Sequence, residues 1–324
     1  MKLELVKKYE TDNIDSYRSC VAINEETAVS LVIEKESDNY SLFFFTPEEM
    51  RILPVDYIET FSIIDNNPVL FSKNGGFGII KNQNELFFYH SIDSNPKKIE
   101  IENKKMFQQV LPPKPRFRYP NPISDSDVLP VCFQHTFFNG NDSRYFALLH
   151  LNIENQKAKW ESWSNLGKQV FCAQGFYTQG LSKDDPPKID SLMIKNGDVF
   201  IFTSGETEGV NKWGMDYYGI AKTTRNGKIV ETLLDSGNLK IIDQKKRGVN
   251  GIFSSSQKYV ILTPVFQSDE WKGKQKLFSV ESKEFIDIEF PSNFGKSPRI
   301  IQHSGKYFWV YFRDTRHFAI CQEK

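Results

Sequence analysis

The stretch that comes closest to a ligand-binding motif is Gly295-Lys296-Ser297, which matches the last three residues of a phosphate-binding loop. That loop, G-x-x-x-x-G-K-[ST], holds phosphates with its backbone N–H groups and leads into a helix. Here Phe290 stands where the first glycine is required, and Pro298 follows where the helix should begin. We therefore do not expect a nucleotide to bind at this segment.

Residues that could hold a metal ion are few and poorly spaced. Of the five histidines, His135 lies three residues after Cys132, in a C-x-x-H spacing. Residues three apart on a strand point to opposite faces, so this pair could share one ion only if the strand were broken. Asp125-Ser126-Asp127 lacks the glycine and the distant glutamate of a calcium loop. The sequence predicts neither a metal ion nor any other cofactor.

Nucleophilic catalysis has no support from local motifs. The chain contains no G-x-S-x-G turn, and no cysteine stands in a recognised arrangement with a histidine and an asparagine. A catalytic group gathered from several distant segments would leave no such motif. A hydrolase is therefore unsupported by the motifs but stays open as an alternative.

Aromatic and basic residues in polar segments are the remaining candidates for contact with a partner. Trp213 and Trp271 lie in polar, glycine-containing connections, where tryptophan often anchors an interface. The stretch Arg116-Phe117-Arg118-Tyr119 alternates basic and aromatic side chains, which suits an acidic partner. We predict that these six residues bind a partner. The alternative is that the tryptophans pack onto their own structural units and that the stretch only holds its segment in place.

The composition indicates a folded chain with no net charge. Of the 324 residues 14% are aromatic, and 41 basic residues balance 41 acidic ones. Nucleic acids and anionic membranes both require a clustered positive face, so neither is an expected partner. The longest apolar run, Tyr259 to Phe266, has eight residues and contains Pro264, which is too short to span a membrane.

The N-terminus and the cysteines favour a cytoplasmic location. Charged residues interrupt every apolar pair between Met1 and Lys8, so this segment does not resemble a signal peptide. The cysteines at 20, 132, 172 and 321 form no C-x-x-C motif, which indicates reduced thiols rather than disulfides. An exported protein whose signal had been removed would look the same.

The elements that position these candidates should be strands, because no long window shows the apolar period of a helix. Turn clusters such as Asn74-Gly75-Gly76 and Asn196-Gly197-Asp198 separate short runs rich in β-branched and aromatic residues. The predicted strands are Ala28–Ile33, Tyr40–Phe45, Phe77–Ile80, Leu86–His90, Tyr145–Leu151, Val170–Phe176, Val199–Thr203, Tyr217–Ala221, Tyr259–Leu262 and Tyr307–Phe312.

One short pattern, a polar turn followed at once by four or more strand-forming residues, occurs six times. Its successive copies are 46, 59, 54, 60 and 48 residues apart, counted between the first strand residues Tyr40, Leu86, Tyr145, Val199, Tyr259 and Tyr307. Repeats of about 40 to 50 residues are typical of a β-propeller, in which each repeat is one four-stranded blade. The spacing therefore indicates six blades.

We predict that residues 1–324 form a single all-β domain, a six-bladed β-propeller. A closed ring buries both faces of every blade and leaves only short edges. Closure should place Leu3–Val6 in one sheet with Tyr307–Phe312 and His317–Cys321. Two stacked β-sandwiches are the alternative fold, and five or seven blades would also fit the spacing.

A proline-rich stretch, Leu111–Pro130, interrupts the regular pattern. It contains six prolines, and proline is excluded from the interior of a sheet. Because strands resume with the same spacing after it, we predict a long surface loop within the one domain rather than a linker between two domains.

These features together predict a monomeric, non-enzymatic scaffold that binds another protein through loops at its rim, in one version as an inhibitor or immunity-type protein. The alternative is a carbohydrate- or metabolite-directed hydrolase or lyase with its site in the central channel, whose ligand would be a glycan or a small molecule. Three or more carboxylates, arginines or histidines converging at the mouth of the channel would favour that alternative.

Overall fold

The computed structural model describes residues 1–35, 40–55, 68–81, 85–103, 116–117, 121–136, 142–162, 188–205, 217–224, 229–236, 249–264, 271, 273–292, 294 and 297–324. All regular elements within these ranges are β-strands, which confirms the all-β prediction. A search of the same ranges finds no helix long and apolar enough to span a membrane.

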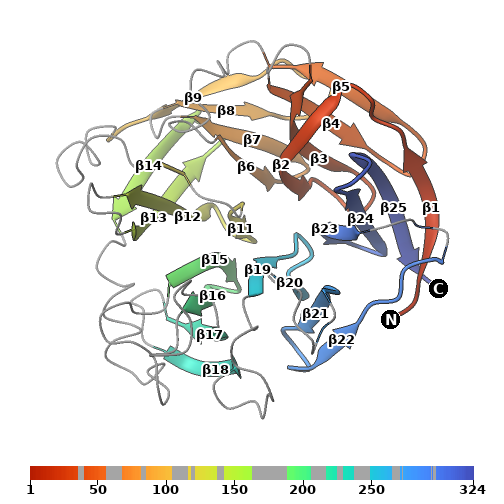
Figure 1. Ribbon diagram of the computed structural model, residues 1–324. Helices are drawn as coiled ribbons and strands as arrows, with labels where there is room; N and C mark the ends of the chain where they lie inside the picture. The colour runs from red at the N-terminus through yellow and green to blue at the C-terminus, as the bar shows by residue number, and fades with distance from the viewer. Residues whose placement is uncertain are drawn as a thin grey trace.

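The described strands form five sheets, and the largest of these consists of two antiparallel groups joined by a short parallel pairing of Lys157–Ala158 with Glu100–Ile101. Counted separately, the described strands form six consecutive antiparallel groups arranged around a ring, so the fold is a β-propeller (Figure 1). The first three groups are β2 (Ile14–Ala22), β3 (Ala28–Glu34), β4 (Tyr40–Phe45) and β5 (Met50–Pro54); β6 (Val69–Lys73), β7 (Gly76–Lys81), β8 (Glu85–Tyr89) and β9 (Lys97–Ile101); and β12 (Val128–Thr136), β13 (Asp142–Asn152) and β14 (Lys157–Ser162).

The second half of the ring repeats this arrangement. Its groups are β15 (Lys188–Lys195), β16 (Asp198–Gly205), β17 (Tyr217–Thr223) and β18 (Ile229–Asp235); β19 (Val249–Phe253), β20 (Tyr259–Pro264), β21 (Lys276–Ser279) and β22 (Phe285–Asp287); and β23 (Pro298–Ser304), β24 (Tyr307–Phe312) and β25 (His317–Glu323) with β1 (Leu3–Tyr9). Two short strands, β10 (Arg116–Phe117) and β11 (Ile123–Ser124), pair with β12 and β15.

Apolar side chains fill the spaces between neighbouring blades. One cluster joins the β2–β5 blade to the β23–β25 blade, where Phe45 and Trp309 meet edge to face with ring centroids 6.4 Å apart. Another joins the β2–β5 blade to the β6–β9 blade, with Phe44 against Phe77 at 5.3 Å. The β2–β5 blade thus buries its two apolar faces against its neighbours, as the blades of a closed ring require.

The two ends of the chain meet in one sheet, as predicted. β1 pairs antiparallel with β25 from Leu3 opposite Glu323 to Tyr9 opposite Phe318. The backbone N–H of Leu3 also donates to the carbonyl oxygen of Glu289, at 2.9 Å, just after β22. The N-terminal strand therefore completes the last blade and touches the blade before it.

The repeated sequence pattern occurs once in each group of strands but not at equivalent strands. Its first two copies lie on β4 and β8, the third strands of their groups, whereas the other four lie on β13, β16, β20 and β24, the second strands. The six copies therefore do not mark equivalent positions in their blades. The predicted turns at Asn74-Gly75 and Asn196-Gly197 are two-residue hairpins with φ of 49° and 76°, and of 52° and 80°, as type I′ turns require.

The prediction of a surface loop at 111–130 is wrong for residues 121–123 and 128–130, which are buried. Asn121 and Ile123 are 9% and 4% exposed, and β12 begins at Val128 and includes the buried Pro130. Pro130 is opposite Leu148 of β13 on one edge of β12. The other edge of β12 pairs with β10, but only at Phe133 and Gln134. At Pro130 this second edge has no strand partner, so the missing N–H of proline costs no hydrogen bond there.

Candidate binding site in the central channel

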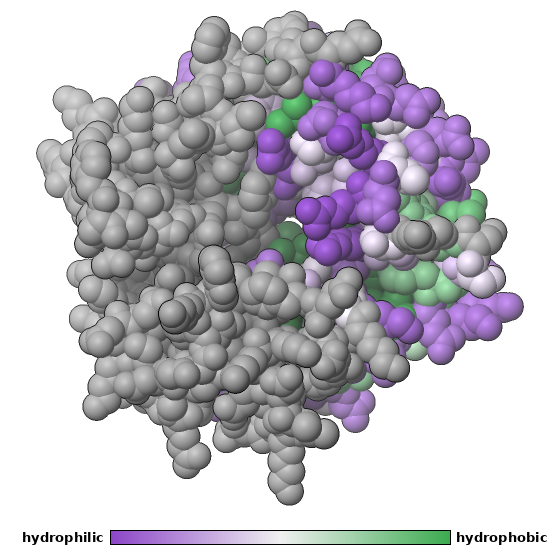
Figure 2. Space-filling model, viewed as in Figure 1, coloured by the Kyte–Doolittle hydropathy of each residue, from purple (hydrophilic) through white to green (hydrophobic). Residues whose placement is uncertain are grey.

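Two adjoining cavities occupy the centre of the ring, between the innermost strands β2, β19 and β23. The larger cavity, here called the funnel, has a volume of about 550 Å³ and lies where these strands begin. The smaller one, here called the inner cavity, has about 270 Å³ and lies further along the same strands. Tyr17, Ile252 and Ile301 line both cavities, so the two lie next to each other. Figure 2 shows the hollow at the centre of the ring, with hydrophobic side chains inside it and hydrophilic ones around it.

Charged side chains in the funnel are mostly arginines. Arg299 at the start of β23 lines it together with Arg313 and Arg316 from the turn between β24 and β25. Asp15 is the only carboxylate in the described lining, and its Oδ1 lies 2.8 Å from Nη1 of Arg316. Neither Arg299 nor Arg313 forms an ion pair with a residue that the structure describes. The funnel therefore carries two positive charges without a partner.

Tyrosine and amide groups form the wall behind these charges. The rings of Tyr17 and Tyr311 contact each other with centroids 4.9 Å apart. Burial raises the pKa of Tyr17 well above its usual value, against the opposing effect of the Arg299 charge, so the phenol stays neutral and cannot compensate the arginines. Gln275 is 6% exposed, and its Nε2 donates to Thr263 Oγ1 at 2.7 Å while its Oε1 accepts from the Ile300 N–H at 2.6 Å.

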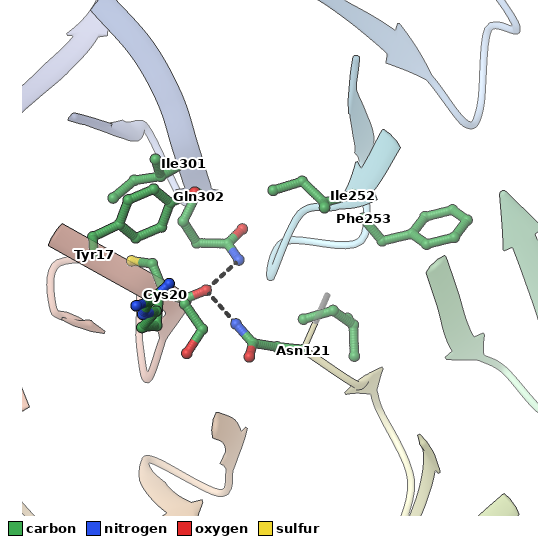
Figure 3. Close-up of a pocket in the computed structure, with 10 residues that line it drawn as sticks. Tyr17, Cys20, Asn121, Ile252, Phe253, Ile301 and Gln302 are labelled. Carbon is green, nitrogen blue, oxygen red and sulfur yellow. Dashed lines mark hydrogen bonds between the residues drawn. The ribbon is translucent and has the colours of Figure 1, made fainter. Parts of the chain in front are cut away.

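Hydrogen bonds between distant segments hold the wall of the inner cavity. The carbonyl oxygen of Cys20 on β2 accepts from Asn121 Nδ2 at 2.9 Å and from Gln302 Nε2 at 3.1 Å (Figure 3). Gln302 Oε1 accepts from the Ser255 N–H at 2.6 Å, which ties β23 to the turn after β19. In Figure 3 the side chain of Ile252 points toward this network, whereas that of Phe253 points away from it. Burial raises the pKa of the Cys20 thiol well above its usual value, so it is not a nucleophile.

A serine–histidine pair near this wall has the distance of a catalytic dyad. Ser256 Oγ lies 2.7 Å from His303 Nδ1. His303 is 3% exposed, and its ring donates a hydrogen bond to the backbone of Gly305; burial, and then the charge of Lys258, lower its pKa to about 4. Ser256 Oγ is also shared with Ser254 and the Lys258 N–H. A buried neutral imidazole with these contacts stabilises the turn between β19 and β20 rather than activating a nucleophile.

The structure corrects the prediction that Trp271 contacts a partner at the rim. It is 5% exposed and packs edge to face on Tyr218 and Phe285, with centroids 5.9 and 6.0 Å away. The side chain joins the core between the β15–β18 and β19–β22 blades, so it is not available as a rim anchor. Packing onto the protein's own structural units was the alternative to partner binding for both Trp213 and Trp271.

The other predicted contact residues are only partly described. Arg116 and Phe117 form β10, which pairs with Gln134 and Phe133 of β12, and their side chains lie outside the described part. Trp213, Arg118 and Tyr119 fall outside the described residues altogether. Their role in binding stays a prediction.

The arginines of the funnel were missed by motif reading, although three of them converge at the channel as the alternative function required. The described lining of the two cavities includes no histidine and no second carboxylate. Nor do three metal-ligating side chains cluster anywhere in the described ranges. A signal was present in the sequence, because Arg18 and Arg299 each interrupt an otherwise uncharged strand segment, in Ser16–Ala22 and Ser297–Ser304. Charged side chains on the innermost strands of a ring can face its central channel.

Comparisons with known proteins find structural likeness only. No family model matches the chain, and no curated protein matches it. Among solved structures, the chain is similar to YCF48 bound to D1 peptide, at 7% identity and a TM-score of 0.45, over 98% of this chain and 95% of that one. It is also similar to the β-propeller domain of Myceliophteria thermophila Cps50 (Swd1), at 7% identity and a TM-score of 0.48, over 98% and 99%. At this identity the likeness concerns the fold alone, and the residues of the channel are the guide to function.

Proposed function

We propose that this protein is a non-enzymatic scaffold that binds another protein at the mouth of its central channel. The observation that carries the proposal is the pair Arg299 and Arg313, which line the funnel without a carboxylate partner. Arginine binds carboxylates through two parallel hydrogen bonds, and this geometry makes it the preferred residue for recognising acidic groups at interfaces. The expected partner presents an acidic segment to the funnel.

The distribution of charge supports this proposal. The whole chain is neutral, with 41 basic and 41 acidic residues, so an excess of positive charge in one cavity is a local property. Such an excess steers an acidic partner toward the cavity and orients it on arrival.

The ends of two neighbouring strands lie beside the funnel. Asn250 of β19 and Thr263 of β20 are opposite each other and both line the funnel. The chain therefore enters β19 and leaves β20 at this side of the ring. The predicted contacts at Trp213 and at Arg116-Phe117-Arg118-Tyr119 would extend this surface along the rim loops.

A capture experiment followed by a binding measurement tests the proposal. The tagged protein is used to retain partners from lysate of its source organism, and the partner found in near-stoichiometric amount is purified and titrated by calorimetry. The double variant Arg299→Gln/Arg313→Gln should bind at least about tenfold more weakly, because each lost charged hydrogen bond costs roughly 1.5 to 3 kcal/mol. Raising the salt concentration should weaken the wild-type complex more than that of the variant.

The control is Arg51→Gln, which removes an exposed arginine on β5 that pairs with Asp93 at 2.7 Å, outside the channel. This variant should bind like the wild type. Equal affinity of the wild type and the double variant would show that the partner does not use the funnel. Reproducible absence of a stoichiometric partner would contradict the scaffold function itself. If the partner is an enzyme whose activity the complex abolishes, the narrower inhibitor or immunity version holds.

A second candidate is a hydrolase or lyase that acts on an anionic carbohydrate or metabolite in the channel, because three arginines converge there as that function would need. Turnover of uronic-acid oligosaccharides by the wild type, lost in Arg299→Gln, would establish it. The described lining offers Asp15, paired with Arg316, as its only carboxylate, which supports binding over proton transfer.

A further inference from the structure

Two polar atoms in the lining of the inner cavity, Arg18 Nε and Ser19 Oγ, are buried without a hydrogen-bond partner among the described residues. Arg18 occupies the bulge of β2, where the pairing with β3 shifts between Tyr17 and Ser19. Its Nε is buried and has no acceptor among the described residues, and the same holds for the hydroxyl oxygen of Ser19, a residue only 3% exposed. Both residues line the inner cavity.

Leaving these groups unpaired destabilises the folded chain. A buried donor without a partner costs roughly 1 to 3 kcal/mol, and more when it is charged. The described lining of the inner cavity contains no carboxylate. The neighbouring Tyr40 does not supply a negative charge, because burial raises its phenol pKa although Arg18 acts to lower it. The compensating group must therefore come from outside the described part of the chain.

The other polar groups of the cavity are already engaged. Asn121 Nδ2 and Gln302 Nε2 both donate to the carbonyl oxygen of Cys20 (Figure 3). Arg18 and Ser19 are the lining residues whose buried polar atoms have no described partner, and they are adjacent in the chain. A guanidinium next to a hydroxyl matches the acceptor atoms of one carboxylate.

The remaining wall is apolar. Ile123 and Ile301 are 4% and 3% exposed, and Ile252, Phe253 and the ring of Tyr17 complete the lining. The volume is about 270 Å³, whereas an apolar cavity of about 150 Å³ already accepts benzene. The inner cavity therefore has room for one ring or branched alkyl group together with a carboxylate.

We propose that the inner cavity binds a small carboxylic acid with an apolar body. Its carboxylate accepts hydrogen bonds from Arg18 and Ser19, and its apolar part packs against Ile123, Ile252 and Ile301. The ligand enters through the funnel, since both cavities share part of their lining. This site is separate from the protein-binding surface proposed above and does not depend on it.

Calorimetric titration with a charged and a neutral probe of the same shape tests the site. Benzoate and benzamide form one pair, and 4-methylpentanoate and 4-methylpentanamide form a second pair with a branched body. The carboxylate of at least one pair should bind the wild type with one-to-one stoichiometry and a Kd of about 1 mM or tighter. Its amide should bind at least about tenfold more weakly, because it lacks the charge that pairs with Arg18.

The variants separate the inner cavity from the funnel. Arg18→Gln should weaken carboxylate binding at least about tenfold, and Ser19→Ala a few-fold. Arg313→Gln removes an unpaired arginine of the funnel and should change the Kd less than about twofold, since that residue does not line the inner cavity. If binding falls in Arg313→Gln and not in Arg18→Gln, the ligand sits in the funnel and the proposal is overturned.

Thermal unfolding checks that the variants remain folded. Arg18→Gln should unfold at about the same temperature as the wild type or higher, because Arg18 forms no hydrogen bond or ion pair with the described residues that the substitution would break. The bound carboxylate should raise the unfolding temperature of the wild type only. No saturable binding by either carboxylate, or equal affinity for acid and amide, would refute the site. Should Arg18→Gln fail to fold, Ser19→Ala with the two probe pairs decides the question.

Discussion

At the scale of single residues, buried polar side chains hold the centre of the ring together. The amide of Gln302 makes three hydrogen bonds, because Oε1 accepts from the N–H groups of Ser255 and His303 and Nε2 donates to the carbonyl oxygen of Cys20. Gln275 connects β21 to β20 and β23 in the same way. Removing one partner from such a network leaves the other buried and unpaired. The wall of the channel is therefore rigid, and the unpaired Arg18 and Ser19 stand out against it.

His303 should make stability depend on pH. Its pKa is lowered from 6.5 to about 4 in the folded state, first by burial and then by the charge of Lys258. The unfolded chain thus binds the extra proton in the window between pH 6.5 and pH 4, so the free energy of unfolding decreases as the pH falls through this window. The loss contributed by this residue should approach about 3 kcal/mol at pH 4.

Urea unfolding followed at several pH values between 7.5 and 4 measures this effect. His303→Gln should show a shallower decrease than the wild type over the same range, because glutamine does not titrate. His90→Gln, at an exposed position after β8, serves as the matched control and should keep the wild-type dependence. Identical curves for His303→Gln and the wild type would mean that His303 is not the titrating group.

At the scale of elements, strands and tight turns follow local residue preferences, whereas the contacts between blades do not. Alternating aromatic and β-branched residues mark β4, β16, β20 and β24, and Asn-Gly pairs mark two hairpins. These features depend on neighbours in sequence, so they were predictable. The position of Trp271 depends instead on whether Tyr218 and Phe285, which are 53 and 14 residues away in sequence, offer it a pocket.

Trp271→Ala should therefore destabilise the fold. The substitution removes a large side chain that is 5% exposed in the core between two blades, and losses of this kind cost about 3 to 5 kcal/mol. Urea unfolding compares this variant with Val230→Ala, which truncates a side chain 56% exposed on β18 and should change stability by less than about 0.5 kcal/mol. If Trp271→Ala left the free energy of unfolding unchanged and weakened partner binding, Trp271 would be a contact residue of the rim rather than part of the core.

At the scale of the whole molecule, pairing of the chain ends closes the ring. β1 supplies Leu3 and Tyr9, 2% and 6% exposed, to clusters shared with neighbouring blades. Without β1, the outer edge of β25 would be unpaired and open to other strands. The same closure brings β2 next to β23, so the channel site depends on it.

Deletion of residues 1–9 should destabilise the protein by about 4 kcal/mol or more, since two buried side chains and a strand pairing are lost. Thermal unfolding of the truncated chain measures the loss, and size-exclusion chromatography detects association through the open edge. Adding a synthetic peptide of residues 1–9 in excess should restore part of the stability by strand addition. A truncated chain as stable as the full chain would contradict closure by β1.

The all-β class, most strand positions, two turns and the meeting of the chain ends were determined by the sequence alone, because they depend on local conformational preference and on a repeat of roughly fifty residues. The channel was decided only by the tertiary structure. Cys20 and Gln302 are 282 residues apart and hydrogen-bonded, and Asn121 comes from a segment expected at the surface. Arg18, Arg299 and Arg313 balance acidic residues in the total charge, so their positions in the two cavities of the channel cannot be read from composition. Sequence spacing carries no information on contacts made when distant blades close into a ring, and a binding site built from such contacts becomes visible only in the folded molecule.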